Sequence, residues 1–261
     1  MNKQSELGLP IEYQQYPEYF DIPANARHED EKNQVIANVL ARYAPKTVLD
    51  MTCGTGAQVF HLLKLGYEVI GSDLSPPLVE IAKDKAAKQN INVQFVVGDM
   101  RYVQLGQFDA VITIDNAIGH LVKEDFAMAL GNIYKHLNSG GIYVFDILNL
   151  DAMTDEVIEA DSKKMTGASI AADGAKIHNV RCSTIDRKRG LLTSNEAITI
   201  QKNGEEKQIK NTCSLQIYTM NELRELLSNN GFQVIEQHKI DTYTFHQNDK
   251  GYGILTVAQK Q

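Results

Sequence analysis

The sequence predicts an α/β protein with a Rossmann-like, doubly wound seven-stranded sheet whose last strand is antiparallel, plus an antiparallel β insertion after the fifth strand. Two observations lead to this prediction. Between residues 47 and 147, short apolar strand patterns alternate with amphipathic helix patterns, which is typical of a parallel sheet covered on both faces. Between residues 165 and 218, apolar and polar residues alternate between turn signals, as in partly exposed antiparallel strands.

The expected elements follow in a regular order. A helix is expected over residues 28–43, because apolar residues recur there at helical spacing and Pro45 follows. Strands are then expected at 47–51, 67–72, 93–97, 108–114 and 142–147, with helices at 58–64, 78–88 and 125–137 between them. After the insertion, a helix at 221–228, with Thr219 as its cap, precedes two mutually antiparallel strands at 232–240 and 253–259.

This order divides the chain into three parts. Residues 1–27 form a polar N-terminal arm with interleaved aromatic residues, which either closes as a lid or adheres to the surface. Residues 28–150 and 219–261 form the ligand-binding domain. Residues 151–218 form the insertion, in which Asn203-Gly204 is a two-residue hairpin signal. The insertion is expected to set specificity or to mediate formation of a homodimer.

Composition and charge exclude several classes of protein. The net charge of −7 argues against a large nucleic-acid footprint, which needs a basic surface. The three cysteines are far apart and the histidines lack ligand-like spacing, so neither a disulfide framework nor a metal site is expected. No apolar run resembles a signal peptide or spans a bilayer, which predicts a cytoplasmic protein without a membrane partner.

The candidate ligand site lies where the predicted strands end. In an open α/β sheet, ligands bind beyond the carboxyl ends of the strands. Gly54 and Gly56, in the stretch TVLDMTCGTGAQ, allow the backbone to bend and to approach a ligand closely. Asp73 ends the second strand, where a carboxylate can accept hydrogen bonds from both hydroxyls of a ribose. Asp99, after the third strand, can accept from an adenine amino group.

The first turn favours a cationic ligand over a nicotinamide dinucleotide. A dinucleotide site needs a third glycine for packing, and Val59 stands at that position. Asp50, four residues before Gly54, would repel a diphosphate but suits a sulfonium ligand that carries an amino group.

Taken together, VLDMTCGTGA, GSDLSPPLVEIAK, VVGDMR, FDAVITIDNAIGHL and LNSGGIYVFDI resemble the successive motifs of class I S-adenosylmethionine-dependent methyltransferases. The resemblance runs from Thr47 to Asn149 in order and includes the closing strand pair. DNAIGHL, the polar arm and the insertion are similar to glycine or sarcosine N-methyltransferases. The layout also resembles the sugar N,N-dimethyltransferases. The resemblance implies methyl transfer to a small-molecule acceptor, with an amine nitrogen favoured.

The resemblance also implies roles for individual residues. Gly54 and Gly56 line the methionine part of the cofactor, Asp115 and Asn116 lie near the sulfonium, and His120 lies in the acceptor pocket. The implied cofactor-binding residues are Arg27, Asp50, Gly54, Gly56, Asp73, Leu74, Asp99, Met100, Asp115 and Asn116, and the implied catalytic residues are His120 and Tyr19.

Several alternatives stay open at this point. A small-molecule O-methyltransferase needs the same cofactor site, and a non-catalytic cofactor-binding protein keeps the same motifs. A nucleic-acid methyltransferase is disfavoured, because DNAI replaces the N-P-P-Y type of run after the fourth strand. His120 is either a base for the acceptor or a half-buried cap of its turn. Arg181, Arg187 and Arg189 are expected on a solvated strand face, although Arg181 could also reach an acceptor carboxylate.

Overall fold

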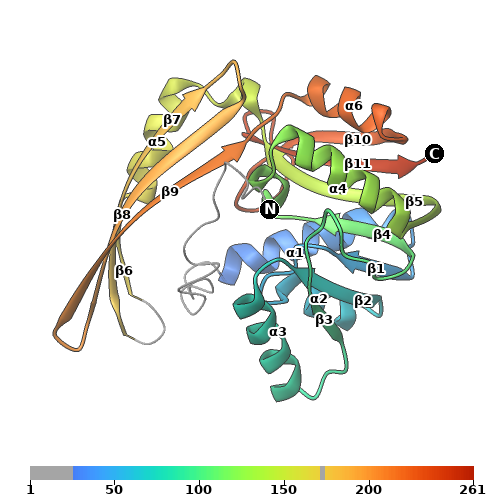
Figure 1. Ribbon diagram of the computed structural model, residues 1–261, viewed down its shortest axis with the longest axis horizontal. Helices are drawn as coiled ribbons and strands as arrows, with labels where there is room; N and C mark the ends of the chain where they lie inside the picture. Colours follow the sequence, from blue (N-terminus) through green and yellow to red (C-terminus); the bar gives the residue numbers. More distant parts are fainter. Residues whose placement is uncertain (1–25, 171–173) are drawn as a thin grey trace.

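The computed structural model describes residues 26–170 and 174–261 and contains two sheets (Figure 1). The larger sheet has the strand order β10-β11-β5-β4-β1-β2-β3. Its strands are β1 (Thr47–Asp50), β2 (Glu68–Asp73), β3 (Gln94–Val97), β4 (Phe108–Thr113), β5 (Leu137–Leu148), β10 (Phe232–Ile240) and β11 (Gly253–Lys260). Strands β1 to β5 pair in parallel, and β11 is antiparallel to both β5 and β10. The predicted fold class is confirmed.

Helices cover both faces of this sheet. α1 (Ala26–Ala41), α2 (Ala57–Lys64) and α3 (Pro76–Lys88) pack their apolar residues into one core with Val48 and Ile112 of the sheet. α4 (Lys123–His136) and α6 (Met220–Asn229) pack on the opposite face, around Phe145 and Tyr218. Burial of both faces explains why the strands read as continuous apolar runs.

Local signals begin the helices where the sequence predicts. Thr219 caps α6: its hydroxyl accepts from the amide of Glu222, and the Glu222 carboxylate accepts from the amide of Thr219. Such a capping box satisfies two amides that the helix itself leaves unpaired. Ser75 likewise caps α3, and its hydroxyl accepts from the amide of Leu78.

The insertion after β5 forms the second sheet, in the order β6-β7-β8-β9. Its strands are β6 (Gly167–Ile170), β7 (Lys176–Asp186), β8 (Leu191–Lys202) and β9 (Glu205–Gln216). Asn203 and Gly204 both have positive φ and form the predicted tight turn between β8 and β9. A helix that the sequence did not predict, α5 (Asp155–Met165), precedes these strands and contacts β7. Figure 1 shows this sheet beside the edge where β1, β4 and β5 end.

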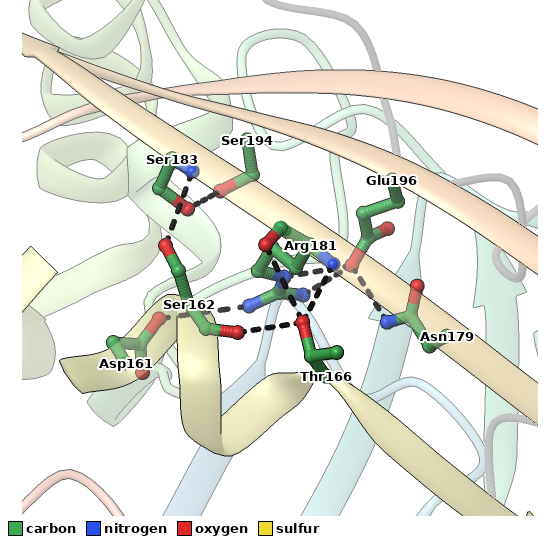
Figure 2. A network of polar contacts seen from close by, with 8 residues as sticks. All are labelled: Asp161, Ser162, Thr166, Asn179, Arg181, Ser183, Ser194 and Glu196. Carbon is green, nitrogen blue, oxygen red and sulfur yellow. Dashed lines mark hydrogen bonds and ion pairs between the residues drawn. The ribbon is translucent and has the colours of Figure 1, made fainter. Parts of the chain in front are cut away.

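Arg181 does not lie on a solvated strand face, so that expectation is wrong for this residue. Its guanidinium pairs with Glu196 on the neighbouring strand at 2.6 Å, and Asp161 of α5 lies 3.8 Å away. Figure 2 shows the guanidinium between these two carboxylates, beside the C-terminal end of α5. The sequence did not predict α5, which covers this face of the sheet. Because its guanidinium pairs with Glu196 and Asp161, Arg181 is already engaged in the structure and is not available to bind an acceptor carboxylate.

Candidate active site

Acidic side chains gather where the parallel strands end. Asp50 is the last residue of β1 and is fully buried. One of its carboxylate oxygens accepts from the amide of Thr52 at 3.1 Å, while the other is buried without a hydrogen-bond partner in the described part of the chain. Burial, helped by the charges of Asp73 and Asp115, raises the pKa of Asp50 to about 8. A buried, unpaired carboxylate oxygen is suited to a cationic ligand.

Asp73, the last residue of β2, ties the glycine turn to its own strand. One carboxylate oxygen accepts from the amide of Gly54 at 2.8 Å and the other from the amide of Ser75 at 2.9 Å. Burial raises the pKa of Asp73, although these amides oppose the shift. The turn places Gly54 and Gly56 at positive φ, and a Cβ at Gly56 would lie 2.9 Å from the rings of Phe60 and Phe95. The two glycines are therefore required by the backbone as well as by close approach.

The loop after β3 is held by a pair of acids around one arginine. Arg101 contacts Asp99 at 2.6 Å and Asp125, in the first turn of α4, at 2.7 Å. Burial tends to raise the pKa of Asp99, but the Arg101 guanidinium and amide lower it overall. Both oxygens of Asp99 accept from Arg101. Met100 beside it is half-buried against the core.

Leu74 follows Asp73 with its side chain 49% exposed. It offers an exposed apolar surface at the end of β2, and its place beside the cofactor stays a prediction.

The turn after β4 has an unusual backbone. Asp115 and Asn116 are consecutive non-glycine residues with φ of 60° and 57°. The left-handed conformation is unfavourable for such residues and clusters at functional sites. The short 3₁₀ helix η4 (Ala117–His120) follows, ends at the half-buried His120 and contacts β9 of the second sheet. His120, which was predicted in the acceptor pocket, therefore ends a short helix that contacts both sheets.

Two residues of the site escaped the sequence analysis. Lys32 of α1 forms an ion pair with Asp115, and its ammonium lies over the ring of Phe245. Asp146 of β5 is 4% exposed, and burial together with the charge of Asp115 raises its pKa to about 8. One oxygen of Asp146 accepts from the amide of Asn116 at 3.0 Å. The acid in VFDILN, at the end of an apolar strand, was the available signal for Asp146.

Two predicted residues cannot be placed in this arrangement. Tyr19 lies outside the described residues, as does the side chain of Arg27.

In residues 26–170 and 174–261, no three His, Cys, Asp or Glu side chains gather in a way that could hold a metal ion. The described helices include none that is long and apolar enough to cross a membrane.

A family model described as a methyltransferase domain matches residues 48–141. Residues 48–141 therefore resemble a methyltransferase domain. The matched residues run from β1 to the start of β5 and contain the glycine turn, Asp73, Asp99 and the Asp115-Asn116 turn. The match confirms the predicted class I methyltransferase domain and supports S-adenosylmethionine as its cofactor.

Known proteins resemble between about a third and nine tenths of the chain. A glycine/sarcosine N-methyltransferase of Parasynechococcus marenigrum is 33% identical over 51% of this chain and 49% of its own length. A magnesium-protoporphyrin O-methyltransferase of Rhodobacter capsulatus is 36% identical over 37% of this chain and 43% of its own. The chain thus spans about half the length of these curated relatives or less. The structure of CalS10, an amino pentose methyltransferase from Micromonospora echinaspora, has a TM-score of 0.69 at 21% identity, covering 90% of this chain and 92% of CalS10. This likeness shows a shared fold.

Proposed function

We propose that this protein transfers a methyl group from S-adenosylmethionine to the amine nitrogen of a small-molecule acceptor. The observation that carries the proposal is the gathering of Asp50, Asp73, Asp115 and Asp146 at the ends of four neighbouring strands. Lys32 pairs with Asp115, so the cluster holds more acids than basic groups, and a buried acid such as Asp50 ionises more readily when a cation binds beside it. Both a sulfonium cofactor and a protonated amine are attracted to such a site.

The residues fit the cofactor part by part. The orphaned oxygen of Asp50 suits the cofactor ammonium group, and Asp73 suits the ribose hydroxyls. The glycine turn allows close approach of the backbone. S-adenosylmethionine supplies a methyl group that is already activated, so the protein's own task is to orient the acceptor and to exclude water.

An amine attacks only as the neutral base, so the site must remove a proton. A residue that titrates near neutral pH is suited to this step. His120, at the end of η4, is in this proposal the group that accepts the proton. The second sheet, which η4 contacts, forms the roof of the acceptor pocket and sets its specificity. Residues 28–150 and 219–261 then bind the cofactor, and residues 151–218 select the acceptor.

A second candidate is methyl transfer to oxygen, which the partial match to an O-methyltransferase supports. The purified protein is incubated with methyl-labelled S-adenosylmethionine and matched pairs of acceptors: glycine against glycolate, and an amino sugar against its hydroxyl analogue. Label in the amines alone supports the proposal. Label in the hydroxyl compounds favours the second candidate. Tight cofactor binding without label in these compounds or in a cell lysate would instead indicate a non-catalytic cofactor-binding protein.

A further inference from the structure

Asp146 is a buried acid that contacts the reactive end of the site without belonging to the predicted cofactor set. It lies near the end of β5, opposite Leu255 of β11. One carboxylate oxygen accepts from the amide of Asn116, and the other is buried without a hydrogen-bond partner in the described part of the chain. A buried acid of this kind costs stability, so its presence here calls for a role in the site.

The role of Asp146 follows from the turn that its carboxyl group contacts. Asp115 and Asn116 adopt consecutive left-handed conformations, which are unfavourable for non-glycine residues, although aspartate and asparagine tolerate them better than most. Such a conformation persists only when its surroundings hold it in place. Three contacts do so: the amide of Asn116 donates to Asp146 at 3.0 Å, the Asn116 side-chain oxygen accepts from the amide of Leu148 at 3.0 Å, and Asp115 pairs with Lys32.

The turn in turn sets the position of η4. The side chain of Asn116 folds back over this helix, so that a Cβ at Gly119 would lie only 2.7 Å from the side-chain nitrogen of Asn116. The amide of Gly119 also donates to the carbonyl of Asn116 at 2.9 Å. His120 is the next residue along the chain. The orientation of His120 therefore depends on the conformation of Asn116.

We infer that Asp146 is a positioning residue for methyl transfer: its carboxyl oxygen holds the Asp115-Asn116 turn and thereby places η4 and His120 at the acceptor. The inference rests on the proposed function. The hydrogen-bond acceptor at this position matters here, and the negative charge does not. Burial keeps Asp146 largely neutral at pH 7, so asparagine is a close mimic of the native group.

The test compares Asp146→Asn, which retains an acceptor oxygen at the same reach, with Asp146→Glu, which retains the carboxyl group but moves its oxygens by one methylene. Tyr143→Phe is the matched control, because it removes a buried 2.6 Å hydrogen bond to Thr113 from the other face of the same strand. We expect the glutamate variant to lose about 10- to 100-fold in kcat, since a misplacement of about 1 Å can cost on the order of 100-fold. The asparagine variant and the control should stay within about threefold of the wild-type kcat, because neither displaces the turn.

Two further readouts separate positioning from general damage. The KM for the amine should change less than kcat in the glutamate variant. Hydrogen exchange in peptides covering residues 114–121 should be faster in that variant, but not in the asparagine variant or the control. If the glutamate variant does not fold, Asp146→Ser, whose hydroxyl is too short to reach the Asn116 amide, takes its place with the same expectation.

The inference is overturned if the glutamate variant is as active as the asparagine variant, or if exchange over residues 114–121 is unchanged. An equal loss in the Tyr143→Phe control would also overturn it. If the wild-type protein binds S-adenosylmethionine but methylates no amine, the proposed function fails. The exchange measurement then still decides whether Asp146 holds the turn.

Discussion

Replacing Asp50 with asparagine should stabilise the unliganded protein while weakening cofactor binding. Asp50 is fully buried and has a pKa of about 8, whereas an aspartate in an unfolded chain titrates near about 3.9. Below about pH 4 the group is protonated in both states, so the pKa difference does not affect stability. As the pH rises toward about 8, the unfolded state ionises and the folded state does not, so the free energy of unfolding falls.

The size of the stability change follows from this difference in pKa. At pH 7 the free energy of unfolding is lowered by up to about 4 kcal/mol, because about three pH units separate this pH from the unfolded pKa. Asparagine removes this loss. Its side-chain NH₂ takes the place of the Asp50 oxygen that has no hydrogen-bond partner, and burying this unpaired group costs about 1–3 kcal/mol, which offsets part of the gain. We therefore expect a net stabilisation of about 1–3 kcal/mol at pH 7, and no stabilisation near pH 4, where only the amide penalty of about 1–3 kcal/mol remains.

Cofactor affinity should change in the opposite direction. A cation about 4 Å from ionised Asp50 contributes about 4 kcal/mol at an effective dielectric constant near 20, and ionising the group at pH 7 costs about 1.4 kcal/mol. The asparagine variant should lose the difference, about 2–3 kcal/mol, or roughly 30- to 150-fold in Kd. The affinity of the wild-type protein for the cofactor should also rise about tenfold from pH 6 to pH 7, because ionising Asp50 costs less at the higher pH. The asparagine variant should not show this pH dependence.

Two measurements on the same preparations test this reasoning. Denaturant unfolding without ligand, at pH 4.5 and pH 7, gives the stability difference, and calorimetric titration with S-adenosylmethionine at pH 6 and pH 7 gives the affinities. Asp109 provides a control, because amides of the neighbouring backbone and Asn138 lower its pKa to about 2. Asp109→Asn should destabilise the protein at both pH values and leave cofactor affinity unchanged. An Asp50→Asn variant that is destabilised at pH 7, or that binds the cofactor as tightly as the wild type, would refute the argument.

Three other substitutions are predicted from single contacts. Asp73→Ala should weaken S-adenosylmethionine binding by about 100-fold or more in calorimetry, because it removes two charge-assisted bonds to the turn amides as well as the ribose acceptor. His120→Ala should lower kcat by about 100-fold in a methyl-transfer assay with little change in cofactor Kd; a lost affinity would make the residue structural. Arg101→Leu should weaken cofactor binding about 5- to 10-fold by leaving Asp99 and Asp125 unpaired, whereas Lys83→Leu, which breaks only an exposed pair within α3, should not change it.

Much of the fold follows from local patterns in the sequence. The apolar runs that end in Asp50 and Asp73 give two neighbouring parallel strands, because a doubly covered sheet requires apolar residues on both faces. Thr219 begins α6, and Asn203-Gly204 turns the chain between β8 and β9, since both motifs act through the backbone alone. The helix α5 has a capping threonine, Thr154, which the sequence analysis did not use, because the segment that follows is polar and its apolar side, with Ile158, is recognisable only against the second sheet.

The predicted site is incomplete for a related reason. Lys32 and Asp146 lie 83 and 31 residues from Asp115, and only the packing of α1 and β5 around the end of β4 brings them together. A lysine on an amphipathic helix is normally a solvated residue, so its position alone does not mark a site. Arg181 is the converse case: its alternating pattern indicates an exposed face, and the unpredicted α5 covers that face.

The two acids with strongly raised pKa values play different parts in the same site. Asp50 has an unpaired oxygen and no basic partner among the groups that shift its pKa, so its burial is relieved only when a cation binds. Asp146 instead has an amide to hold and Lys32 nearby, so it can act as a neutral acceptor whether or not ligand is present. The cofactor can therefore supply the positive charge that Asp50 lacks, while Asp146 keeps the turn at the acceptor end in place. The buried Asp50 at the end of β1 therefore lowers stability in favour of cofactor binding. Asp146 in β5, two strands away, holds the turn that positions His120.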